Sequence, residues 1–247
     1  MTTYFHEKRT CALCGQSSEH LGLGSTNAFG SPDLDLRPPE MQRSTMAQWI
    51  EECPHCGYAY KTIDEKVAGV DNMPKLLANV DETPASQLWR RLFNEHCSVS
   101  DGTSEPEHNL VRRFLTASKV AQIAGSTDDA ADYALCAAWA AEDHNDSATA
   151  RICRDLAADF FRAIWLEADR PSDIRTVNAA KLTDVLRRAQ HWDEAVALSD
   201  QLLGGELEET IRAVLTFQRE ASLKQDAACY TITDAIEGRS APKAGNT

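Results

Sequence analysis

The sequence lacks the features of membrane, secreted and nucleic-acid-binding proteins. Its longest uninterrupted apolar run covers only residues 133–141, whereas a membrane-spanning helix needs about 20 apolar residues. The N-terminal stretch MTTYFHEKRT has no apolar core of a secretory signal. Basic residues are scarce, since 25 Lys and Arg stand against 38 Asp and Glu, for a formal net charge of −13. Phosphate contacts need clustered Lys and Arg. We therefore expect a cytoplasmic protein that binds neither membranes nor nucleic acid.

Short motifs of common enzyme classes are also missing. The sequence contains no nucleophile elbow, phosphate loop, HExxH or EF-hand. Gly22 and Gly24 supply two glycines of a dinucleotide fingerprint, but the third is absent and no helix pattern follows. Abundant carboxylates in an acidic chain do not by themselves identify an acid–base pair. The sequence therefore predicts no catalytic residue and no organic cofactor.

Four of the eight cysteines form two CxxC units, each followed by glycine. A chain without a secretory signal is not expected to use them as a disulfide framework. In a zinc knuckle a tight turn directs both thiolates to one point, and the glycine permits the positive φ that this turn requires. Two knuckles brought together by flanking strands form a tetrahedral Cys₄ site. We therefore predict one structural Zn²⁺ bound by Cys11, Cys14, Cys53 and Cys56.

Other uses of paired cysteines agree less well with this pattern. A redox CxxC usually occurs once, near a βαβ pattern, and a catalytic zinc keeps a coordination position open. An iron–sulfur cluster can use four cysteines and is the alternative that the sequence leaves open. His55 lies inside the second CxxC unit, where we expect it to face solvent because the cysteines complete the ligand set.

The two knuckles are unusually far apart. Residues 15–52 separate them, whereas a compact ribbon has about 15–20 residues between the pairs. Loop-closure entropy grows slowly with length, so the insertion is compatible with one site. It contains the stretch SPDLDLRPPEM, in which two prolines fix an extended backbone. Its charged side chains form either a partner-binding surface or pairs that hold the insertion against the ribbon: Asp33, Asp35, Arg37, Glu40 and Arg43.

These motifs resemble those of an uncharacterised bacterial domain family in which a zinc ribbon precedes tetratricopeptide-like helices. The resemblance rests on CxxCG, on the insert with SPDLDLRPPEM and on W-x-x-x-C-P-x-C-G-Y, and it covers residues 11–58. It implies a metal-binding, cytoplasmic protein whose zinc ligands are Cys11, Cys14, Cys53 and Cys56. It implies no reaction.

The pattern becomes helical after about residue 62. Thr83 and Pro84 predict a cap and a first helical residue, and apolar residues then recur at helical spacing. Similar signals predict helices that begin near residues 104, 127, 147, 172 and 192, and two more over 206–222 and 226–237. The turn before Trp192 resembles the middle of a tetratricopeptide repeat. We expect a mainly α fold, in which a small Cys₄ zinc ribbon is followed by stacked antiparallel helical hairpins of a tetratricopeptide-like kind.

This reading divides the chain into a zinc-ribbon domain over residues 1–66, a helical domain over 67–240 and a flexible tail over 241–247. The leading hypothesis is a zinc-binding, non-enzymatic adaptor whose helical stack holds a protein or peptide partner. A plain helical bundle that supports the ribbon is an equal alternative for the helices. An enzyme with a polar site between the insertion and the helices, formed by Asp33, Asp35, Arg37 and Glu40, is the second hypothesis, and a nucleic-acid-binding ribbon is the third.

Overall fold

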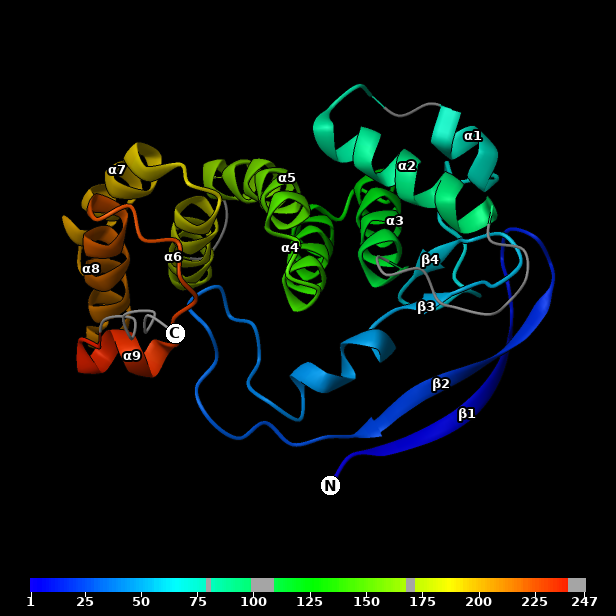
Figure 1. The fold of residues 1–247 in the computed structure, drawn as a ribbon, viewed down its shortest axis with the longest axis horizontal. Coiled ribbons are helices and arrows are strands. Elements are labelled where there is room, and N and C mark those ends of the chain that lie inside the picture. The colour runs from blue at the N-terminus through cyan, green and yellow to red at the C-terminus, as the bar shows by residue number, and fades with distance from the viewer. Residues whose placement is uncertain (79–80, 99–108, 168–171, 240–247) are drawn as a thin grey trace, which may run out of the picture. The chain divides into compact units, whose positions relative to one another are not determined.

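The computed structural model describes residues 1–78, 81–98, 109–167 and 172–239. The fold is mainly α-helical with short antiparallel strands near the N-terminus (Figure 1), which confirms the expected fold class. The strands are β1 (Thr3–Thr10), β2 (Ser17–Ser25), β3 (Glu51–Glu52) and β4 (Ala59–Tyr60), with the 3₁₀ helix η1 (Arg43–Gln48) before β3. The helices are α1 (Met73–Ala78), α2 (Pro84–Ser98), α3 (Asn109–Ile123), α4 (Thr127–Asp143), α5 (Ser147–Leu166), α6 (Ser172–Arg188), α7 (Trp192–Leu203), α8 (Glu209–Leu223) and α9 (Ile232–Glu237). In these described ranges no helix is long and apolar enough to cross a membrane.

Most described helices begin near the residues that the sequence signals predict. Helices α2, α4, α5, α6 and α7 start at or beside the predicted caps, whereas the predicted start near residue 104 and the tail over 241–247 lie outside the described residues. The helix expected from residue 226 begins only at Ile232. The preceding residues are extended because Tyr230 accepts a hydrogen bond from the amide of Leu34 (2.9 Å) and the amide of Ile232 donates to Pro32 (2.9 Å). Backbone hydrogen bonds to residues 32–34 therefore take the place of the helical hydrogen bonds expected before Ile232.

The chain forms two compact units that do not follow the order of the sequence. The first unit contains Met1–Asn27 and Ser44–Phe160, and the second contains Ala28–Arg43 and Phe161–Thr247. Helix α5 contributes to both. The predicted division into residues 1–66 and 67–240 groups the chain by type of element and stays a prediction, as does the repeat character of the helices.

The first unit packs the second β-hairpin against helices. Helix α4 is buried along most of its length through alanines, whose small side chains let neighbouring helices approach closely. Strand β4 packs against α3, and the buried Tyr60 makes an edge-to-face contact with Tyr133 on α4, with ring centroids 6.4 Å apart. Lys61 pairs with Asp129 at 2.8 Å. These contacts attach the turn that carries Cys53 and Cys56 to helices α3 and α4.

In the second unit, residues 28–43 of the insertion between the two cysteine pairs contribute Leu34 to a small apolar core. Leu34 is 2 % exposed and packs with Val214, Tyr230 and Ala235. The rings of Phe217 on α8 and Tyr230 meet edge to face with centroids 4.8 Å apart. Residues more than 170 positions apart in the sequence therefore share this core.

Replacing Leu34 with alanine should destabilise the second unit strongly. The substitution removes a side chain from a packed cluster, so we expect the free energy of unfolding to fall by about 2–5 kcal/mol. Leu166→Ala, at a side chain that is 78 % exposed, should change it by less than about 0.5 kcal/mol. Urea unfolding of both variants measures the difference, and equal effects would contradict the assignment of Leu34 to this core.

Candidate metal centre

The first cysteine pair lies in the turn that joins β1 to β2. The amide of Cys11 donates a hydrogen bond to the carbonyl of Gln16 (2.9 Å), and the amide of Gly15 donates to the carbonyl of Cys11 (2.9 Å). Gly15 has a φ of 72°, which only glycine adopts without strain. This bonding closes the turn and places Cys11 and Cys14 on the same side of it.

The second cysteine pair lies in the turn between β3 and β4 and repeats this geometry. The amide of Cys53 donates to the carbonyl of Tyr58 (2.8 Å), and the amide of Gly57 donates to the carbonyl of Cys53 (2.9 Å). Gly57 has a φ of 74°. A Cβ atom at this position would lie 2.7 Å from the ring of Phe93, so packing as well as backbone conformation requires glycine here.

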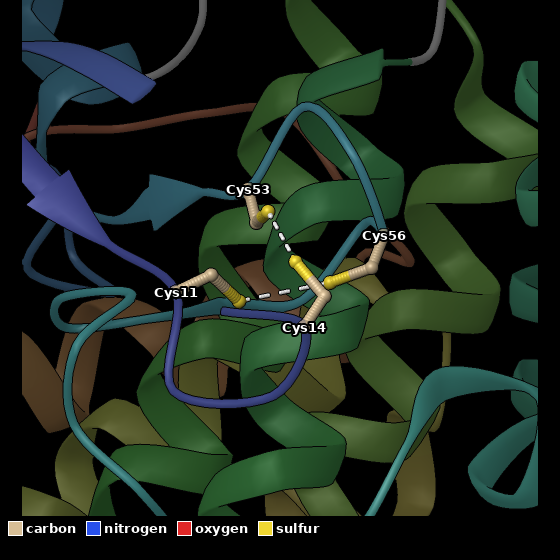
Figure 2. Close-up of side chains that lie close together, drawn as sticks. All are labelled: Cys11, Cys14, Cys53 and Cys56. Atoms are coloured by element: carbon tan, nitrogen blue, oxygen red, sulfur yellow. Dashed lines mark hydrogen bonds between the residues drawn. The ribbon is translucent and has the colours of Figure 1, made fainter. Parts of the chain in front are cut away.

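The structure brings the four cysteines predicted as metal ligands together. The Sγ atoms of Cys11 and Cys56 are 3.7 Å apart, those of Cys14 and Cys53 are 3.6 Å apart, and all four lie within 4.8 Å of one another. Figure 2 shows the sulfurs of one turn directed at those of the other. A disulfide would need about 2.05 Å, whereas metal–sulfur bonds of 2.3 Å in a tetrahedron place the sulfurs about 3.8 Å apart. The four side chains could therefore hold a metal ion.

The electrostatics of the cluster favour a cation at its centre. Burial raises the pKa of Cys53 to about 11, although the backbone amides of His55 and Cys56 oppose this effect. Burial also raises the pKa of Cys56, against the amide of Tyr58. At Cys14 burial acts in the same direction, but the amide of Gln16 and the neighbouring thiols outweigh it and lower the pKa. Four thiolates this close repel one another, so the ionised cluster needs a positive charge between them.

Ion pairs attach both turns to their surroundings. Glu52, next to Cys53, binds the buried guanidinium of Arg112 on α3 at 2.5 and 2.8 Å. Arg113 donates to the carbonyls of Ala47 (3.0 Å) and Ile50 (2.8 Å), just before the second turn. Sequence reasoning missed these residues, because a pair about 60 positions apart leaves no local pattern. The only signal was the presence of two adjacent arginines between the apolar residues Val111 and Phe114 of α3.

Near the first turn, Arg9 of β1 forms the ion pairs. Arg9 lies two residues before Cys11 and binds Glu51 at 2.7 Å and Asp64 at 3.0 Å. Glu51 also accepts a hydrogen bond from the amide of Ile63 (3.0 Å). These bonds join the first hairpin to the residues on either side of the second hairpin, and thus limit how far the two turns can separate.

The charged residues of the insertion are placed differently from the cysteines. Asp33, Asp35 and Arg37 are 4 %, 0 % and 5 % exposed. Asp33 pairs with Arg43 at 2.8 Å. Burial, together with the neighbouring Asp35 carboxylate, raises the pKa of Asp33 against the effect of Arg43. Glu40 is exposed. The segment is thus an internal, ion-paired part of the second unit.

This burial changes the interpretation of the insertion as a partner-binding surface. Asp33, Asp35 and Arg37 face the interior, because Asp35 binds Arg188 on α6 at 3.0 Å and accepts a bond from the amide of Arg37 (3.4 Å). Only Glu40 and the partly buried Arg43 retain exposed surface. Pairing within the insertion, the other alternative, occurs between Asp33 and Arg43. The Asp35–Arg188 pair holds the segment against α6 of the second unit, whereas that alternative expected it against the ribbon.

Comparisons of the chain with protein-family models, with curated proteins and with solved structures gave no match. The functional assignment therefore rests on the residues of the chain itself.

Alanine at Gly57 should be more damaging than alanine at Gly15. At Gly15 the new Cβ has no neighbour within 4 Å, so only the left-handed backbone costs energy, about 1–2 kcal/mol. At Gly57 the contact with Phe93 should add about 1–3 kcal/mol. Denaturant unfolding of the two variants measures this difference. Adding Phe93→Leu to Gly57→Ala should recover part of the loss, and an unchanged double variant would contradict the steric explanation.

Asp35→Asn should destabilise the second unit while Glu40→Gln should not. Asp35→Asn breaks the buried ion pair with Arg188, which should lower the free energy of unfolding by about 3–5 kcal/mol. Glu40 is exposed in the same segment, so its loss should change this free energy by less than about 1 kcal/mol. Thermal and urea unfolding of both variants provide the measurement. A larger effect at Glu40 would show that the segment is not held by its buried charges.

Proposed function

We propose that this protein holds a single structural zinc ion between its two β-hairpins, bound by Cys11, Cys14, Cys53 and Cys56. The spacing of the four sulfur atoms is the observation that carries the proposal. Thiolate ligands favour zinc over magnesium or calcium, and four protein ligands leave no open position for catalysis. In a cubane iron–sulfur cluster each cysteine binds a different iron, which would hold the sulfurs farther apart than around one ion.

The bound ion would neutralise the thiolates and cross-link turns that are 39–45 positions apart. Strands β1 and β2 have mostly exposed side chains, and an isolated two-stranded hairpin is marginally stable in water. The cysteines therefore attach the β1–β2 hairpin to the second turn, a connection that its exposed strand side chains do not provide. In small metal sites of this kind, binding free energy contributes directly to folding.

The biological role that we propose is that of a cytoplasmic, non-enzymatic adaptor from the uncharacterised bacterial zinc-ribbon family that the motifs resemble. The helices would supply the partner-binding surface. Two features support this role over the enzyme hypothesis: the charged groups of the insertion are bound to each other and to α6, and the cysteine site is closed. The net charge of −13 argues against a nucleic-acid partner.

Purified protein should contain one zinc per chain by elemental analysis. Cys11→Ser and Cys53→Ser should each lose the metal, and hydrogen exchange of residues 1–25, whose strands are mostly exposed, should rise to the level of unprotected amides. Cys229→Ser is the matched control, because this cysteine is outside the cluster, and it should keep the zinc. Iron in place of zinc, or full zinc retention in the two knuckle variants, would overturn the assignment.

The adaptor role predicts a partner that contacts the helices. Cross-linking in the source cells should join residues of α2 to α8 to one partner protein, and the two should co-elute when purified together. A chain that yields only cross-links within itself and elutes as a monomer from those cells would contradict this role, whatever its zinc content.

A further inference from the structure

A cleft of about 270 Å³ lies in the first unit, where the start of α2 meets α3 and α5. Its apolar lining comes from all three helices: Trp89, Leu115, Ile152, Leu156 and Phe160. Trp89 is held rigidly, because its indole N–H donates to the hydroxyl of Thr116 (2.8 Å) and its ring meets Phe93 edge to face at 6.4 Å. The cleft therefore has a fixed, largely apolar floor.

The rim of this α2–α3–α5 cleft is acidic. Among the described residues that line it, Asp81, Asp155 and Asp159 carry negative charge and Lys119 carries positive charge. Asp81 accepts hydrogen bonds from the hydroxyls of Ser86 (2.5 Å) and Thr83 (2.8 Å), which lower the pKa of its carboxyl. Lys119 donates to the side chain of Gln122 (2.9 Å). An apolar floor with a net negative rim is complementary to an apolar group that has cationic neighbours.

The size of the cleft indicates what kind of group it accepts. Pockets for small-molecule ligands usually measure about 300–1,000 Å³ and enclose most of the ligand. A cleft of about 270 Å³ is large enough for one bulky side chain. Interfaces commonly obtain much of their affinity from such an anchor in a pocket, surrounded by polar contacts.

We propose that the α2–α3–α5 cleft binds a segment of a partner protein in which one bulky apolar side chain is flanked by Lys or Arg. The apolar side chain contacts Trp89 and Leu156, and the flanking cations approach the carboxylates of Asp155 and Asp159. This inference rests on the proposed adaptor function and names the class of partner. The excess of negative charge on the chain would also accelerate the encounter with a basic segment.

Fluorescence anisotropy with a defined panel of labelled peptides tests the proposal. Each peptide has the form Lys-Arg-X-Lys-Arg with glycine at both ends, where X is Leu, Phe, Trp or Ala, and a fifth peptide replaces the four basic residues of the Trp peptide with Glu. At least one bulky peptide should bind 10-fold or more tightly than the Ala peptide, and the Glu peptide should not bind. Equal binding of the Ala and bulky peptides, or no binding by any of them, would overturn the proposal.

A pair of matched protein variants identifies the site. The double variant Asp155→Asn with Asp159→Asn should weaken binding of the best peptide about 10-fold and reduce its salt dependence. Glu95→Gln removes an exposed carboxylate of α2 that does not line the cleft, and it should leave the affinity within twofold. Equal affinities of the double variant and the wild type would show that the peptide binds elsewhere.

Two outcomes keep this test separate from that of the proposed function. Zinc content and circular dichroism of the double variant should match the wild type, so weaker binding reports the cleft and not misfolding. Loss of all peptide binding with cellular cross-links intact overturns the cleft alone. Absence of zinc in the purified protein overturns the metal centre and leaves the peptide measurement valid.

Discussion

Convergence of four sulfur atoms within 4.8 Å is the constraint on which the N-terminal part of the molecule depends. The hairpin of β1 and β2 is long, and most of its side chains are exposed, so it has little core of its own. Its position is fixed instead at its tip, where Cys11 and Cys14 meet the second turn, and at Arg9, which binds acids on both sides of that turn. The second hairpin is short but packs on α3 through β4. One hairpin is therefore ordered by packing and the other by attachment to it.

Buried arginines form the second organising feature. Arg112, Arg154 and Arg187 are each at most 1 % exposed. Arg112 and Arg154 bind carboxylates of other elements, Glu52 and Glu142. Arg187 binds Asp184 on its own helix and donates to the carbonyls of Asp226 and Ala228 after α8. Arginine suits this role because its planar head forms several directional hydrogen bonds at once. Such pairs add less stability than an apolar contact of equal size. A packing arrangement that separates the two partners, however, leaves a buried charge uncompensated, which strongly destabilises the fold. They therefore select one packing arrangement among several that apolar contacts alone would permit.

The parts of the structure that could be predicted are those encoded by neighbouring residues. The CxxCG turns depend on residues within one short stretch, and Thr83-Pro84 marks a helix start by local capping chemistry, because the Thr83 hydroxyl accepts from the amide of Ser86 (3.3 Å). The role of the segment around Leu34 could not be predicted, because its partners Tyr230 and Arg188 lie far along the chain. Its charges were compatible with an exposed partner-binding surface or with pairs that hold the insertion against the ribbon, and neither alternative identifies α6 as the element that they contact. The prediction of a helix from residue 226 is wrong for the same reason, because Tyr230 and Ile232 form hydrogen bonds with Leu34 and Pro32 and not along the chain.

The path of the chain between the two knuckles has a practical consequence for dissecting the protein. After β2 the chain enters the second unit, contributes Leu34 and Asp35 to its interior, and returns to the first unit before Cys53. A fragment that begins at residue 67 would thus lack Leu34, which packs with Tyr230, and Asp35, which pairs with Arg188. No single scission of the backbone separates two self-sufficient halves. Recombinant versions of the C-terminal helices need the stretch 28–43 supplied as well, either fused through a new connection or added in trans.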